Sequence, residues 1–136
     1  LWQGLGYYSR ARNLQAAARA IINNHEGEIP MRAQQLRSLP GVGRKTAACV
    51  LIFTWGIPEI PVDVHIYRVG GRLGLFHQGA SFERAHDEML AIVDPEDAYE
   101  LHMNLIRHGR EVCRPKPRCG ECGLRRMCPF YRETRR

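Results

Sequence analysis

The chain has 136 residues, 44% of them hydrophobic and 25% charged, and a formal net charge of +6 at pH 7. These values are typical of a soluble globular chain that forms one domain or two small lobes sharing a core. No apolar run approaches the roughly 18 residues that a membrane span needs, and no signal peptide precedes the first helical pattern. We therefore expect an intracellular protein with no membrane partner.

The positive charge is unevenly distributed. Ten of the 20 basic residues lie between Arg107 and Arg136, against three acidic ones. This bias favours a polyanionic partner such as nucleic acid, although a basic tail is also compatible with a merely solvated surface.

The first part of the chain contains three helical patterns. Apolar residues recur at helical spacing from Leu14 to Ile22, and the polar segment 23–30 ends that helix. A short helical segment follows at 33–39 and stops at Pro40. The stretch from Arg44 to Trp55 is apolar on more than one face, which predicts a buried helix.

The second part begins with a proline-interrupted connection, GIPEIPVD at 56–63, that cannot lie inside a helix. Asp63 is expected to cap a helix that runs to Leu73, although two consecutive glycines weaken that prediction. Ser81 opens another helix, and Asp94 is expected to cap the last long one, with proline at its first position. The inner faces of these two helices are expected to comprise Phe82, Ala85, Met89, Leu90 and Val93, and then Ala98, Leu101, Leu105 and Val112. No window alternates like a strand, so the sequence predicts an all-α fold.

The sequence LPGVGRKTA, at residues 39–47, joins the short helix to the apolar one. Its glycines allow a tight turn and a close approach of the backbone to another molecule. The unpaired N–H groups at the start of the next helix form a phosphate site, which makes this segment a candidate DNA-binding element: Gly41, Val42, Gly43 and Arg44. A plain helix–helix turn is the alternative.

Lys45 lies in the first turn of that helix and is one of only two lysines in an arginine-rich chain. The helix dipole there disfavours the ammonium form, and a neutral amine is a nucleophile, which arginine cannot replace. Asp63 could manage the protons of such an amine. The alternatives are a solvated or phosphate-binding lysine and a plain N-cap aspartate.

The pair LPGVGRKTA and VDVHIYRV resembles the helix-hairpin-helix base-excision DNA glycosylases, specifically their endonuclease III branch. The resemblance implies that Lys45 attacks the sugar C1′ of a damaged nucleotide and that Asp63 is the general base and stabilises the oxocarbenium ion. It implies a glycosylase with AP-lyase activity on oxidised pyrimidines in duplex DNA. It also implies that 1–62 is the second half of a six-helix barrel, with the hairpin motif at about 33–55, and that 63–136 is a helical domain ending in a cluster loop.

Four cysteines lie within 16 residues: Cys113, Cys119, Cys122 and Cys128. Zinc and a [4Fe–4S] cluster both accept four thiolates, and disulfides are the alternative in a secreted protein. The family resemblance favours a [4Fe–4S] cluster at 113–128, although the first gap is five residues where the family usually has six. Cys49, alone in an apolar helix, is expected to be an inert core thiol. In the family, this loop also presents basic side chains to DNA, here Arg114, Lys116 and Arg118.

The opening segment LWQGLGYYSRARNL resembles the adenine-mismatch and thymine-mismatch branches more closely. In those branches the first tyrosine, here Tyr7, wedges into the duplex beside the extruded base; a core aromatic is the alternative. The resemblance implies that double-stranded DNA with damaged, mismatched or abasic nucleotides is the partner, and that the protein is cytoplasmic and nucleoid-associated if its source is prokaryotic. A mismatch-specific glycosylase and a non-catalytic DNA-binding fragment remain alternative functions. We expect a monomer and further sequence before Leu1.

Overall fold

The computed structural model describes residues 3–4 and 6–135, and within them every regular element is a helix. The all-α prediction is therefore confirmed for this part of the chain. The elements in order are α1 (Tyr8–Asn24), α2 (Ala33–Arg37), α3 (Arg44–Trp55), α4 (Val64–Leu73), α5 (Phe82–Ile92), the 3-10 turn η1 (Pro95–Asp97), α6 (Ala98–Glu111), the 3-10 turn η2 (Cys119–Glu121) and α7 (Pro129–Glu133). None of the described helices is long and apolar enough to cross a membrane.

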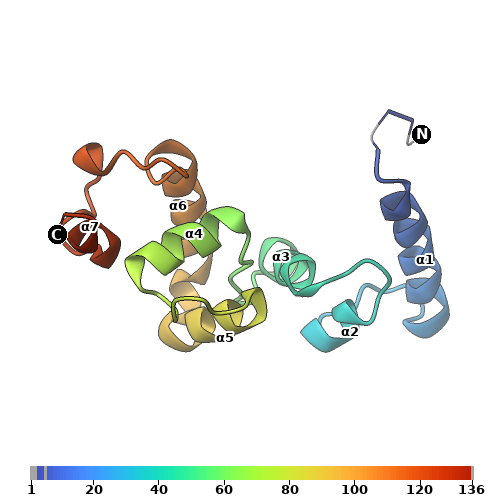
Figure 1. Cartoon of the computed structure of the whole chain (residues 1–136). Coiled ribbons are helices and arrows are strands. Elements are labelled where there is room, and N and C mark those ends of the chain that lie inside the picture. Colours follow the sequence, from blue (N-terminus) through green and yellow to red (C-terminus); the bar gives the residue numbers. More distant parts are fainter. Residues whose placement is uncertain (1–2, 5, 136) are drawn as a thin grey trace.

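The molecule is elongated, with α1 and α2 at one end, α4 to α7 at the other, and α3 between them (Figure 1). A smaller apolar cluster joins α1, α2 and α3 through Ala17, Leu36, Leu39, Ala47 and Leu51. A larger cluster comprises Ile52, Ile60, Val62, Ile66, Val69, Phe76, Ala80, Ala85, Met89, Ala98 and Leu105. Helix α3 thus contributes side chains to both clusters and links the two ends of the molecule. The domain boundary at residue 62 stays a prediction.

The two strongest helix-start signals are confirmed. The Asp63 carboxylate accepts hydrogen bonds from the backbone N–H groups of His65 and Ile66, both at 2.8 Å, and the Ser81 hydroxyl accepts one from Arg84 at 3.2 Å. Asp94 was expected to do the same but makes no side-chain cap bond. A 3-10 turn at Pro95–Asp97 precedes α6 instead, so the last helix begins three residues later than the proline signal predicts.

Helix α4 continues through its two glycines, and packing against Phe76 explains why one of them is glycine. A Cβ atom on Gly70 would lie 2.7 Å from Cε1 of Phe76, which folds back over the helix. The glycine therefore allows an aromatic ring to close the core where the sequence alone suggested a weak helix.

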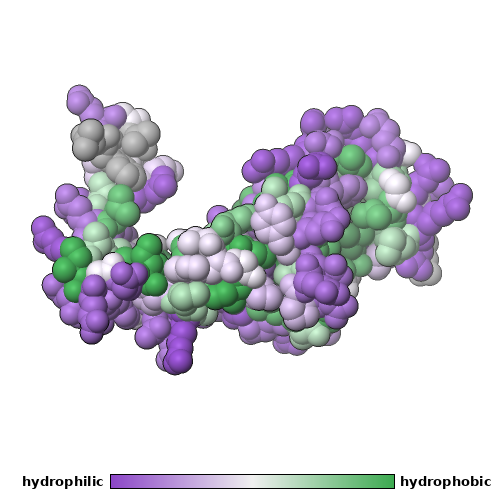
Figure 2. Space-filling model, turned by 180° about the vertical axis from the view of Figure 1, so that it is seen from behind, coloured by the Kyte–Doolittle hydropathy of each residue, from purple (hydrophilic) through white to green (hydrophobic). Residues whose placement is uncertain are grey.

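Several apolar side chains that the helical pattern places on inner faces are exposed. Phe82 lies at the surface, where its ring stacks on Tyr67 at 4.4 Å between centroids. Leu14 and Ile22 of α1 are 63% and 65% exposed. Figure 2 shows hydrophobic side chains at the surface of the arm at the left of the view, which is the end of the molecule that carries α1. Cys49 is half-buried rather than a core residue.

The turn before α3 depends on Gly41, and Gly41→Ala is expected to destabilise the fold. Gly41 has φ +77°, and a Cβ atom there would lie 2.7 Å from Cβ of Asn13, so α1 and the turn would have to separate. We expect a loss of about 1–3 kcal/mol in the free energy of unfolding, measured by urea denaturation. Gly43→Ala is the matched control, because a Cβ there meets nothing within 4 Å. An equal loss in both variants would contradict this account.

Candidate functional site

The turn and the first residues of α3 form one end of the candidate site. Gly43 is the N-cap, with extended backbone, and Arg44 and Lys45 are the first two residues of the helix. The first N–H groups of a helix have no partner inside it, so they face outward at the positive end of the helix dipole. Nothing inside the protein requires a glycine at position 43, which is consistent with close approach by another molecule.

The structure brings Lys45 and Asp63 to the same place. Both line an open hollow of about 430 Å³ formed by the start of α3, the connection before α4 and the start of α5. Its other lining residues include Gly43, Val62 and Phe82. Lys45 is exposed, so its amine is accessible to a large substrate.

Asp63 is held rigidly at one edge of this hollow. Both of its cap hydrogen bonds end on Oδ1, which leaves Oδ2 outside them. The two bonds thereby fix the carboxylate relative to the start of α4. Asp63 is half-buried, and the N-cap that the sequence offered as an alternative role coexists with its place beside Lys45.

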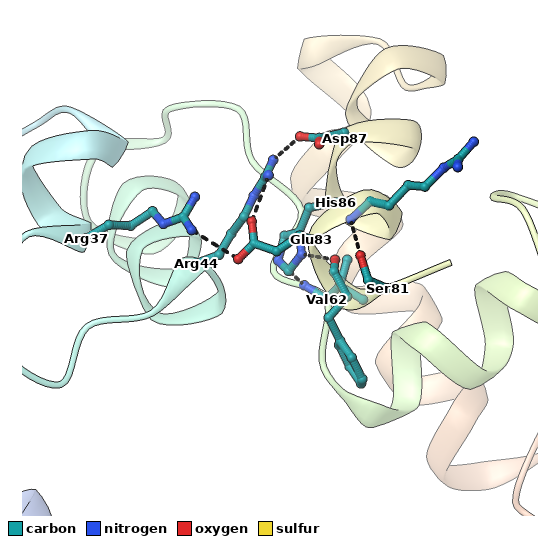
Figure 3. Close-up of polar contacts among 9 residues, drawn as sticks. Arg37, Arg44, Val62, Ser81, Glu83, His86 and Asp87 are labelled. Atoms are coloured by element: carbon teal, nitrogen blue, oxygen red, sulfur yellow. Dashed lines mark hydrogen bonds and ion pairs between the residues drawn. The ribbon is translucent and has the colours of Figure 1, made fainter. Parts of the chain in front are cut away.

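Arg44 is engaged within the protein. Its guanidinium pairs with Asp87 at 2.6 Å and with Glu83 at 3.3 Å, and Glu83 also pairs with Arg37 at 3.1 Å (Figure 3). Burial acts to lower the pKa of Arg44, but the bonds to the two carboxylates outweigh it and raise the pKa. The side chain thus ties the turn before α3 to α5, so it is not a free cation for a DNA contact.

Two buried histidines lie beside the site, and no sequence motif assigns either of them a role. His86 of α5 is 1% exposed and His102 of α6 is 2% exposed. His86 accepts a hydrogen bond at Nε2 from the backbone N–H of Val62 at 3.0 Å. The signal that would have found them is a histidine on the apolar face of a helix, between Ala85 and Met89 and between Ala98 and Leu105.

The four loop cysteines line one small cavity between the ends of α4 and α6 and the start of α7, and they include the buried Cys128. Burial, followed by the charges of the other three sulfurs, raises the pKa of the Cys119 thiol. Such repulsion is relieved when thiolates bind iron or zinc.

The chemistry of the four thiols fits a metal group with thiolate ligands. In the described part of the chain, no three His, Cys, Asp or Glu side chains lie close enough to hold one metal ion. Zinc, with Zn–S bonds of about 2.3 Å, would need four sulfurs within about 4 Å of one another. Four thiols spread around a shared cavity are compatible with a larger polynuclear group. Arg72 donates a hydrogen bond from Nη1 to Sγ of Cys113 at 3.4 Å.

The remaining predicted DNA contacts lie on exposed surface. Arg114, Lys116 and Arg118 are exposed in the loop between the first two cysteines. Tyr7 is 78% exposed, so it is not a core residue, and it adopts a left-handed conformation with φ +46° immediately before α1. A left-handed conformation is uncommon for tyrosine.

The amino-acid sequence matches a known protein family. The family described as HhH-GPD superfamily base excision DNA repair protein matches residues 1–95, about 70% of the chain. The chain belongs to the HhH-GPD superfamily. The helix-hairpin-helix resemblance of the sequence is thereby confirmed.

Among curated HhH-GPD relatives, endonuclease III from Escherichia coli strain K12 is 41% identical over 125 residues, which cover 91% of this chain and 59% of the relative. Endonuclease III from Bacillus subtilis strain 168 is 39% identical over 123 residues, covering 90% and 56%. The chain thus spans a little under three fifths of these relatives.

Solved structures agree with the endonuclease III branch. A trapped endonuclease III–DNA covalent intermediate gives a TM-score of 0.87 at 35% identity, covering 98% of this chain and 62% of the other. A thermostable thymine-DNA glycosylase gives 0.76 at 28% identity, covering 91% and 59%.

Proposed function

We propose that this chain carries the catalytic centre of a base-excision DNA glycosylase with AP-lyase activity on oxidised pyrimidines in duplex DNA. The observation that carries the proposal is the shared hollow of Lys45, an accessible primary amine, and Asp63, a rigidly held carboxylate. The relatives named endonuclease III and the covalent DNA intermediate in a similar structure support the same reaction class.

In the proposed reaction, Nζ of Lys45 forms a bond to C1′ of the extruded nucleotide as the bond from C1′ to the base breaks. The base leaves with the electron pair of that bond and takes a proton from the solvent. Asp63 stabilises the positive charge that develops on the sugar and takes up the proton that the amine loses. Opening of the sugar ring gives a Schiff base between Lys45 and C1′. Loss of a proton from C2′ then breaks the bond between C3′ and its phosphate oxygen, which cleaves the strand by β-elimination.

DNA binding is assigned to the turn before α3, to the cysteine loop and to the residue before α1. Backbone N–H groups of Gly41, Gly43 and Arg44 would bind a phosphate at the start of α3, whereas the N–H of Val42 donates to the Leu39 carbonyl oxygen at 3.1 Å within the turn. Exposed Arg114, Lys116 and Arg118 would add contacts to the phosphate backbone, and exposed Tyr7 would fill the space of the extruded base.

We assign Cys113, Cys119, Cys122 and Cys128 as the residues that would hold a [4Fe–4S] cluster. When bound, the cluster would crosslink the last long helix to the basic loop. Its chemistry is structural: it would fix the loop that presents Arg114, Lys116 and Arg118 to DNA.

A comparison of duplex substrates tests this function. We expect cleavage of duplexes that contain thymine glycol, and little product from G·T or A·8-oxoguanine duplexes of the same sequence. Preferential excision from a mismatch would instead support a mismatch-specific glycosylase, which the similarity to the thymine-DNA glycosylase structure and the GLGYY segment favour. Salt-sensitive binding with no lesion preference and no product would indicate a non-catalytic DNA-binding fragment.

A further inference from the structure

The peptide group between Pro61 and Val62 lies directly before Asp63, and both of its polar atoms bond to buried histidines. Pro61 and Val62 are both almost completely buried. The Val62 N–H donates to Nε2 of His86 at 3.0 Å, and the Pro61 carbonyl oxygen hydrogen-bonds to the ring of His102. Two helices, α5 and α6, therefore hold one peptide group from its two sides.

We propose that His86 and His102 are positioning residues that orient Asp63 toward Lys45 by fixing the Pro61–Val62 peptide group. This inference rests on the proposed function, because it concerns the carboxylate that is assigned to the reaction. The histidines act through the backbone and are not catalytic residues.

The bonds of His86 define its protonation state. A backbone N–H can only donate, so Nε2 of His86 must be the unprotonated acceptor. Nδ1 lies 2.7 Å from the carbonyl oxygen of Phe82 and therefore carries the proton. Figure 3 shows His86 reaching from α5 to Val62, beside the ion pairs of Arg44 with Glu83 and Asp87. A second proton on His86 would remove the acceptor that Val62 requires.

His102 is held in a corresponding way from the other side. Its ring lies edge-on to Phe53 of α3 at 5.5 Å between centroids, and Nδ1 is buried without a hydrogen-bond partner among the described residues. The ring therefore uses its other nitrogen as the donor to the Pro61 carbonyl oxygen. Phe53 and Lys45 both lie on α3. The contact between His102 and Phe53 therefore helps to fix the position of the Pro61–Val62 peptide group relative to the helix that carries Lys45.

The two histidine bonds fix the peptide group before Asp63, which the cap bonds of Asp63 do not hold. The cap bonds of Asp63 fix the carboxylate relative to α4, whereas the preceding peptide group sets the direction from which the chain enters the helix. Rotation of that peptide group would break both histidine bonds inside the core. Buried unpaired polar groups are costly, so the orientation is strongly defined.

Neutral histidines are a requirement of this arrangement, and the surroundings favour them. Burial lowers the pKa of His86, assisted by Arg44 and opposed by the Phe82 bond and by Glu83 and Asp87. Burial also lowers the pKa of His102, opposed by Asp63 and the Pro61 bond and assisted by Lys45. The free energy of unfolding should therefore fall as the pH drops below about 6.5, where the unfolded chain binds protons that the native chain does not.

Substitutions that remove or retain the hydrogen bonds test the proposal. His86→Leu and His102→Leu should lower the single-turnover rate of abasic-strand cleavage by about 10- to 100-fold while changing duplex affinity little. His86→Gln and His102→Gln, whose amides can still accept and donate, should recover most of the rate. His77→Gln, at an exposed position, is the matched control. Folded Leu variants that cleave at the wild-type rate, or Gln variants that are as slow as the Leu variants, would overturn the proposal.

A readout that does not need catalysis separates this inference from the proposed function. Hydrogen exchange of the Val62 amide should be slow in the wild-type chain and in His86→Gln, and much faster in His86→Leu. If the wild-type chain cleaves no abasic duplex, the proposed function fails, and the positioning role for its reaction fails with it; the exchange data then report the peptide contact alone. If His86→Leu does not fold, the pH dependence of the cleavage rate in His86→Gln takes its place as the test. The decline in rate at acidic pH should begin at a lower pH in this variant, because glutamine does not gain a proton as His86 does. An unchanged decline would overturn the proposal.

Discussion

Lys45→Gln is expected to lose strand cleavage at abasic sites by on the order of 10³-fold or more, because an amide cannot form a Schiff base. The side chain is exposed and in the first turn of α3, so the substitution should leave the free energy of unfolding nearly unchanged. Single-turnover cleavage of an abasic duplex measures the loss, and duplex affinity should fall only slightly.

The chain provides a matched control for that experiment in its one other lysine, Lys116. Lys116→Gln removes the same charge from the exposed cysteine loop, away from the hollow of Lys45 and Asp63. It should weaken duplex binding and reduce its salt dependence, yet retain cleavage at saturating DNA. Equal loss of cleavage in both variants would mean that Lys45 contributes charge rather than a nucleophilic amine.

Cys122→Ser is expected to abolish iron binding, with its broad visible absorbance, and to lower the thermal midpoint by roughly 10 °C. Cys122 lines the same cavity as the other three loop thiols, and its Sγ lies 3.7 Å from Nε2 of His108. Loss of one thiolate leaves the loop without a closed ligand set, so the basic residues between Cys113 and Cys119 would lose their fixed positions.

Cys49→Ser is the matched control for the cysteine loop, because this half-buried thiol lies in α3 and does not line that cavity. Iron content and absorbance should equal those of the wild-type chain. Stoichiometric zinc without iron in protein purified under anaerobic conditions would contradict the cluster assignment, as would undiminished iron in Cys122→Ser.

Local signals in the sequence predicted those parts of the fold that depend on neighbouring residues. The cap residues Asp63 and Ser81 mark real helix starts, because a short polar side chain can satisfy N–H groups two or three residues away. Asp94 carries the same signal, but the chain forms a 3-10 turn before α6 and the carboxylate makes no cap bond. Chemistry suggested Asp63 as a partner of Lys45, because a nucleophilic amine needs a nearby carboxylate, and the family resemblance supplied their roles. Spacing along the chain does not show that the two residues meet.

Long-range contacts could not be predicted, and they determine much of the site. Arg44 looked like a DNA contact because it begins a helix, yet its guanidinium pairs with residues 39 and 43 positions later. His86 and His102 interrupt apolar stripes without any motif, and only the folded chain shows that both reach the Pro61–Val62 peptide group. Such partners depend on how α5 and α6 pack around α4, which local propensity does not encode.

Borohydride trapping on an abasic-site duplex, followed by mass-spectrometric mapping of the attached peptide, tests the central claim most directly. We predict a covalent protein–DNA adduct in the wild-type chain, located on Lys45, and no adduct in Lys45→Gln. An adduct on another residue, or one of equal yield in Lys45→Gln, would contradict the assignment of Lys45 as the nucleophile.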